Sequence, residues 1–193
     1  NDIIGSVSLN AKEIKYETHS FKKLKTDLKV SKRTLNFNHL QLENAEAIIT
    51  GKLLIEERTP ETFTITTSIK SNDIDLKAMF KEWNNFEQEV IQAENIDGKI
   101  AVNLFFSAPF SLESGILKNA IESTIHLKIN NGRLINLSSF KEISKSLRTS
   151  GAQLVISKKT AKELEEKLLN LKFETLENTL QIKNGVINIP EMT

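Results

Sequence analysis

The chain of 193 residues is long enough to form one domain with a hydrophobic core. Its 26 Lys and Arg against 25 Asp and Glu leave a net charge of +1, and no basic stripe is interleaved with aromatics, so a nucleic-acid partner is not expected. The chain has no cysteine, which excludes disulfides and thiolate metal sites, and no stretch reaches the about 20 apolar residues of a membrane-spanning helix.

Alternation of apolar and polar residues dominates the chain and predicts at least about eight half-buried β-strands. The clearest runs are residues 7–11, 24–30, 35–42, 63–65, 100–106, 125–129 and 180–189. Three dipeptides flanked by such runs, Asp97-Gly98, Asn131-Gly132 and Asn184-Gly185, predict tight hairpin turns because these residues tolerate positive φ. Gly51 is expected at a further turn or in a bulge.

Three segments have apolar residues at helical spacing instead. The predicted starts are a candidate N-cap, Asp75, and two hydroxyl residues with capping-box spacing, Ser139 and Thr160. We therefore predict a mainly β fold with a few helices, in a single domain over residues 1–193. The expected architecture is a curved antiparallel meander sheet, groove-like or half-barrel, with short amphipathic helices packed on it.

Residue types that support catalysis or metal binding do not cluster in the sequence. The three histidines have no metal-ligand spacing, and no phosphate-binding, dinucleotide-binding, hydrolase or zinc-protease motif occurs. We therefore predict no catalytic residue, no metal ligand, no cofactor and no enzymatic activity.

Motifs in the second half of the chain resemble a known family when they are taken in order. Residues 76–98 hold an L-x-x-x-F helix and an N-F-x-Q segment and lead into a D-G-x-I strand, and residues 129–143 contain N-G-x-L-I-N before a helix. Residues 171–192 end with an N-G turn and I-P-x-M. Over residues 74–193 this pattern resembles the C-terminal region of AsmA-like proteins, from which a longer helical insert at residues 151–169 departs.

The resemblance implies a location and a fold. AsmA-like proteins belong to the bacterial envelope, with their bulk in the periplasm and an N-terminal helix anchored in the inner membrane. The resemblance thus implies that this chain is a fragment of a longer protein, whose anchoring segment is absent here. TamB-like relatives form long, groove-shaped β-sheets that shield lipid acyl chains moving between membranes.

Two functions follow from these expectations. The first is a non-enzymatic protein of outer-membrane biogenesis or maintenance that handles phospholipid on an apolar sheet face. Its candidate lipid-facing residues are Phe63, Ile65, Ile69, Val102, Leu104 and Phe106. The alternative is a periplasmic scaffold that binds another envelope protein through a sheet edge or the helix at residues 157–170. The sequence leaves open whether the apolar face is a lipid groove or an ordinary core.

Overall fold

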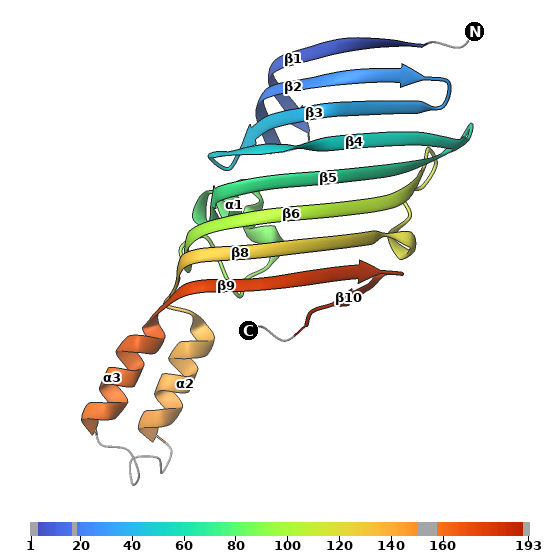
Figure 1. Cartoon of the computed structure of the whole chain (residues 1–193). Helices are drawn as coiled ribbons and strands as arrows, with labels where there is room; N and C mark the ends of the chain where they lie inside the picture. The colour runs from blue at the N-terminus through green and yellow to red at the C-terminus, as the bar shows by residue number, and fades with distance from the viewer. Residues whose placement is uncertain (1–3, 17–18, 150–157, 191–193) are drawn as a thin grey trace. The chain divides into compact units, whose positions relative to one another are not determined.

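The computed structural model of the chain describes residues 4–16, 19–149 and 158–190, and its elements are shown in Figure 1. The strands are β1 (Gly5–Tyr16), β2 (His19–Ser31), β3 (Thr34–Asn44), β4 (Ala47–Thr59), β5 (Thr62–Asp75), β6 (Ile96–Ser111), β7 (Gly115–Ile116), β8 (Glu122–Ile135), β9 (Asn170–Lys183) and β10 (Val186–Asn188). The helices are α1 (Leu76–Glu82), the short η1 (Asn84–Glu87) and η2 (Lys118–Ala120), α2 (Ser138–Thr149) and α3 (Lys158–Leu169).

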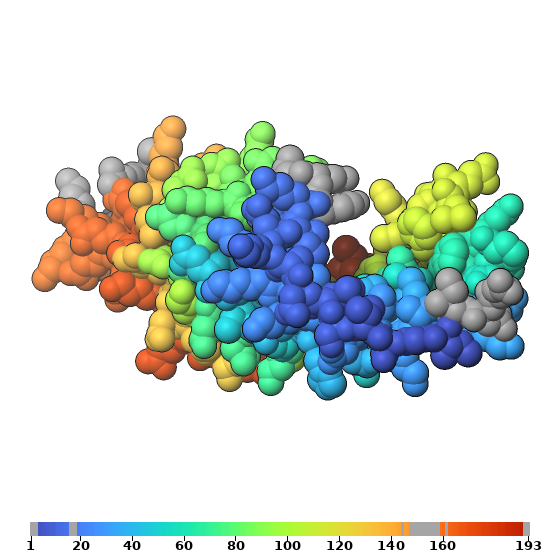
Figure 2. All heavy atoms as spheres, turned by 90° about the horizontal axis from the view of Figure 1, so that it is seen from above, coloured from blue at the N-terminus to red at the C-terminus, as the bar shows by residue number. Residues whose placement is uncertain are grey.

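The strands form one open antiparallel sheet, which confirms the predicted fold class. Nine strands follow the order β1-β2-β3-β4-β5-β6-β8-β9-β10, and β7 pairs with β6. Almost every strand therefore pairs with its neighbour in sequence, as expected of a meander in which short turns join antiparallel partners. Strand β1 forms one edge of the sheet, and its blue atoms face the viewer in Figure 2.

The chain divides into two compact units. Unit 1 comprises residues 1–74, 100–128 and 177–193, and unit 2 comprises residues 75–99 and 129–176. Unit 2 contains α1, α2 and α3, and among its described residues the buried apolar ones are Leu76, Ala93, Ile96 and Leu137. Helices α2 and α3 pack against each other. These buried residues come from three separate segments of unit 2, at the start of α1, around the start of β6 and just before α2.

Only one of the three predicted hairpin turns is a turn. Asn184 and Gly185 join β9 to β10 with φ angles of 53° and 74°, as a type I′ turn requires. Asp97-Gly98 lies inside β6 and Asn131-Gly132 lies inside β8, so both predictions were wrong.

Gly98 and Gly132 serve close packing instead. A side-chain carbon on Gly132 would overlap the ring of Phe173, which covers this glycine from β9. A side-chain carbon on Gly98 would lie 3.0 Å from the Cα of Gly132. The glycines therefore leave room for an aromatic ring and for a close approach of two backbones.

Gly51 lies neither at a turn nor in a bulge of its own strand. It is paired with Ile69 within a continuous register of β4 and β5, and a side-chain carbon there would overlap the backbone oxygen of Ser68. The irregularity lies in the partner strand β3, where the register shifts between Phe37 and Leu40 and His39 has a φ of 50°. The bulge therefore belongs to β3 and faces the region of Gly51.

The predicted helices exist, with differences at their starts. Asp75 caps α1 as expected, because its carboxylate accepts a hydrogen bond of 2.8 Å from the Ala78 N–H. Helix α2 begins at Ser138 and α3 at Lys158, so the predicted caps Ser139 and Thr160 lie inside the helices. The predicted insert at residues 151–169 includes α3, while its residues 151–157 lie outside the described residues, as does Met192 of the I-P-x-M motif.

Candidate functional site

The register of unit 1 places apolar side chains in rows on one face of the sheet. One row joins Val30, Leu35, Ile55 and Ile65 from four consecutive strands. A neighbouring row joins Val7, Leu28, Phe37 and Leu53 from β1 to β4. Because side chains alternate between the faces of a strand, these rows define one face, here called the apolar face.

All six predicted lipid-facing residues lie on the apolar face. Phe63, Ile65 and Ile69 occupy alternate positions of β5, and Ile65 is paired with Ile55 of the row above. On the opposite face, the hydroxyls of Thr66 and Ser107 lie 3.2 Å apart. Since Ser107 shares a face with Thr66, its strand neighbours at alternate positions, which are Phe106, Leu104 and Val102, share the face of Ile65. The structure therefore brings together residues from two segments separated in sequence.

The apolar face of unit 1 is not closed by a core. The six candidate residues are all half-buried, and Val7 and Leu35 keep 50% and 37% of their surface exposed. In the described part of unit 1, the buried apolar residues are few and small to medium in size: Ala47, Ile74, Ile100 and Ala108. The large apolar side chains of this face are therefore partly buried by their neighbours in the sheet, but they remain partly accessible to solvent.

The buried polar groups of unit 1 are used for structure. The hydroxyls of Thr26, Ser71 and Ser123 donate to backbone oxygens at 2.9, 2.8 and 2.8 Å, and the Asn44 amide donates to the Ser20 oxygen at 3.0 Å. A buried group that donates to the backbone stabilises the sheet and is not a free nucleophile. Among the described residues, no group of three or more His, Asp or Glu side chains is placed to hold a metal ion.

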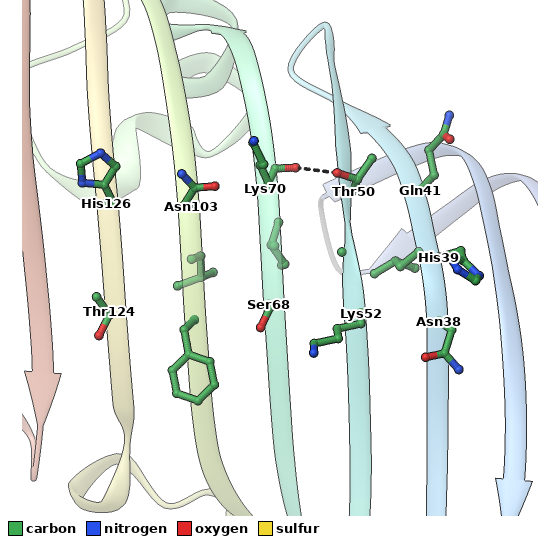
Figure 3. A pocket seen from close by; sticks show the side chains of 15 residues that line it. Asn38, His39, Gln41, Thr50, Lys52, Ser68, Lys70, Asn103, Thr124 and His126 are labelled. Carbon is green, nitrogen blue, oxygen red and sulfur yellow. Dashed lines mark hydrogen bonds between the residues drawn. The ribbon is translucent and has the colours of Figure 1, made fainter.

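The opposite side of the sheet in unit 1 is here called the polar face. A hollow of about 860 Å³ lies on it, lined among others by Asn38, Lys52, Ser68, Lys70, Asn103 and Phe105 (Figure 3). Its lining includes Gly51, Ile69 and Leu104 together with the residues before and after each of them, whose side chains lie on the polar face. Among the described residues, the neighbouring apolar-face side chains of Leu53 and Phe106 do not line it. The hollow, here called the polar hollow, therefore opens on the polar face.

Two histidines border the polar hollow, and each is paired with a carboxylate. His39 Nδ1 lies 3.1 Å from Asp27 Oδ2, and the Ser8 hydroxyl donates to Asp27 Oδ1 at 2.7 Å. These hydrogen bonds, that of Ser8 first, lower the pKa of the Asp27 carboxyl below its ordinary value. His126 contacts the Thr179 hydroxyl at 3.0 Å and Glu177 at 3.1 Å, and Lys128 lies 3.2 Å from the same Glu177.

A smaller hollow of about 410 Å³ lies in unit 2. It is lined by residues around Gly132 and Phe173, and Arg133 forms an ion pair of 2.5 Å with Asp97 beside it. Lys99 contacts Asp75 at 3.2 Å in the same unit. The backbone N–H of Ala78 and then Lys99 lower the pKa of the Asp75 carboxyl, although partial burial opposes them.

Sequence reasoning located the apolar face and missed the polar hollow. The polar residues at 50–52 and 68–70 fit ordinary solvated strand positions, and nothing local in them indicates a hollow. The alternation of the candidate residues on β5 and β6 did indicate their common face, because period two is a property of the strand itself.

No helix in residues 4–16, 19–149 and 158–190 is both long enough and apolar enough to cross a membrane. Comparisons of the chain with family models, curated proteins and solved structures gave no match.

Proposed function

We propose that this chain is part of a non-enzymatic, AsmA-like envelope protein that shields phospholipid acyl chains on the apolar face of unit 1. On this proposal the protein acts in outer-membrane biogenesis or maintenance, and its bulk lies in the periplasm, anchored to the inner membrane. The single observation that supports it best is the exposure of the apolar face, whose large side chains are half-buried without a second layer of unit 1 over them.

On this proposal the hydrophobic effect holds an acyl chain on the apolar face. Each methylene group that leaves water for an apolar surface contributes about 0.8 kcal/mol. Strands lie about 4.8 Å apart, so the row of apolar side chains from β2 to β5 extends over roughly 14 Å. An acyl chain lying along such a row would bury many methylene groups without any specific polar contact. This matches a face that has aliphatic and phenyl groups and few polar atoms.

The experiment that tests this proposal compares two neighbouring residues on opposite faces. Purified, delipidated protein is incubated with fluorescently labelled phospholipid, and saturable uptake is measured for the wild type, Ile65→Glu and Thr64→Glu. Ile65 lies on the apolar face, and a carboxylate there would have to be desolvated against an acyl chain. Thr64 lies on the other face, where its hydroxyl accepts a hydrogen bond of 2.9 Å from Arg58.

We expect the wild type and Thr64→Glu to take up the lipid. Uptake by Ile65→Glu should be weaker than that of the wild type by about tenfold or more. Circular dichroism of both variants serves as the folding control. Equal uptake by all three proteins, or none by the wild type, would refute lipid shielding on this face.

A scaffold that binds another envelope protein is the second candidate. It is favoured by exposed apolar residues on the two long helices, since Ile143 of α2 is 48% exposed and Leu164 of α3 is 38% exposed. The double variant Ile143→Ser/Leu164→Ser would abolish crosslinking to a protein partner if this function holds. Unchanged crosslinking in that variant, together with lipid uptake that depends on Ile65, would rule this candidate out.

A further inference from the structure

The polar hollow differs from an ordinary solvated strand surface in its balance of charge. The carboxylates at its borders are engaged, Asp27 by Ser8 and His39 and Glu177 by His126 and Lys128. Within the described part of the chain, neither Lys52 nor Lys70 forms an ion pair. Two lysine ammonium groups therefore line the hollow without a carboxylate partner.

The register places these two lysines close enough to act on one ligand. Lys52 is paired with Ser68, and Lys70 follows Ser68 by two positions on the same face, which makes the lysines diagonal neighbours. Diagonal neighbours on one face of an antiparallel pair lie roughly 7–8 Å apart and remain within reach of long side chains. Both ammonium groups can thus turn toward an anion above Ser68, which would also relieve their mutual repulsion.

Neutral donors surround the same point. Among the described residues, the Ser68 hydroxyl and the Asn103 amide have no hydrogen-bond partner in the protein, and both line the hollow with Lys70 (Figure 3). Next to them Phe105 is 43% exposed on the polar face, which it shares with Ser107. An exposed phenyl ring beside two cations offers a surface for the carbon skeleton of a ligand.

From this arrangement we propose that the polar hollow binds an organic phosphate, with the phosphate group between Lys52 and Lys70 and the carbon skeleton over Phe105. A phosphate group presents several acceptor oxygens, and as a monoester it also carries more negative charge than one carboxylate, which matches two ammonium groups and neighbouring neutral donors. The phosphate can come from a soluble metabolite or from a lipid headgroup. The hollow lies on the face opposite the proposed acyl-chain surface, so this site is independent of the proposed function.

The test measures amide chemical shifts of the ¹⁵N-labelled chain during titration with three probes. Glycerol 3-phosphate represents a soluble organic phosphate, dihexanoyl phosphatidylglycerol below its micelle concentration represents a lipid headgroup, and glycerol is the uncharged control. The variant Lys52→Gln/Lys70→Gln removes both cations of the hollow. The matched control Lys12→Gln/Lys29→Gln removes two lysines of β1 and β2 that do not line it.

We expect saturable shifts at β4, β5 and β6 with at least one phosphate probe and none with glycerol. Affinity should fall at least about tenfold in Lys52→Gln/Lys70→Gln. It should stay within about twofold in Lys12→Gln/Lys29→Gln, because exposed charges outside a site contribute little. Binding of glycerol 3-phosphate identifies a soluble ligand, whereas lysine-dependent binding of the lipid alone identifies a headgroup.

Three results would overturn the site: no saturable binding of either phosphate probe, equal loss in both double variants, or lipid binding that is lost in Ile65→Glu but unchanged in Lys52→Gln/Lys70→Gln. The last result would leave acyl-chain shielding intact. Conversely, lysine-dependent binding of glycerol 3-phosphate without lipid uptake would support the site and refute the proposed function.

Discussion

Thr66 and Ser107 face each other across β5 and β6, with their hydroxyl oxygens 3.2 Å apart. This pair fixes the phase of β6 relative to β5, because side chains alternate strictly between the two faces of a strand. Ile65 and Phe106 must then both lie on the other side. The assignment of the apolar face across these two strands depends on this relationship.

Cysteine crosslinking tests the relationship directly, since the chain has no native cysteine. We expect Thr66→Cys/Ser107→Cys to form a disulfide under mild oxidation, because the paired side chains lie on one face at a distance that a disulfide can bridge. Thr66→Cys/Phe106→Cys, with its thiols on opposite faces, should not. The yield is measured by mass spectrometry, and comparable yields in both variants would contradict the assignment of faces.

Gly132 is expected to be intolerant of any side chain. Gly132→Ala places a carbon where the Phe173 ring lies, so we expect a loss of about 1–3 kcal/mol in the free energy of unfolding. Phe173→Leu should make the alanine less harmful, and urea denaturation of the single and double variants measures this coupling. Strictly additive effects of the two substitutions would show that the ring does not restrict Gly132.

The sequence predicted the strands and the common face of Ile65 and Leu104 because alternation is a local property of each strand. It predicted a turn at Asn131-Gly132, which lies inside β8, and this error has a nonlocal cause. The same dipeptide suits a turn or a position under an aromatic ring, and the ring that decides between them, Phe173, comes from a strand beyond α2 and α3.

The polar hollow was unpredictable for a related reason. Its lysines meet only through the register of β4 and β5, and its border on β3 depends on a bulge at His39. The alternation of apolar and polar residues along one strand predicts neither the register between strands nor the position of a bulge. The start of α2 was misplaced by one residue, because Ser138 and Ser139 both have a side chain suited to a helix start.

Asp75 should stabilise unit 2 in a pH-dependent way. Its carboxylate caps α1 and contacts Lys99, and these contacts lower its pKa in the folded state. A depressed pKa adds stability that is present above the unfolded pKa of about 3.9 and is lost as the pH falls through the lower folded value.

We therefore expect Asp75→Ala to reduce the free energy of unfolding by about 1 kcal/mol near neutral pH. The difference from wild type should shrink as the pH falls below about 3.9. Urea denaturation across this range measures both quantities. A difference that stays constant or grows toward acid pH would contradict the capping role of the ionised carboxylate.

The Asp27 carboxyl should respond to the loss of its Ser8 partner. Ser8→Ala removes the hydrogen bond that contributes most to the lowered pKa, so the pKa of Asp27 should rise toward its ordinary value. Ser6→Ala, two residues away on the same strand, is the matched control and should leave it unchanged. Carboxyl chemical shifts followed during an acid titration measure the pKa. An unchanged pKa of Asp27 in Ser8→Ala would show that the Ser8 hydrogen bond does not lower it.

The most direct test of acyl-chain shielding asks which face of the sheet a lipid tail touches. Phospholipid with a photoreactive diazirine in its acyl chain is bound to the delipidated protein, irradiated, and the crosslinked residues are identified by mass spectrometry. We predict crosslinks at the apolar face, centred on Ile65, Ile69 and Leu104, and few at Lys52 or Lys70. Crosslinks confined to the polar face, or none above the level with unfolded protein, would contradict the proposal.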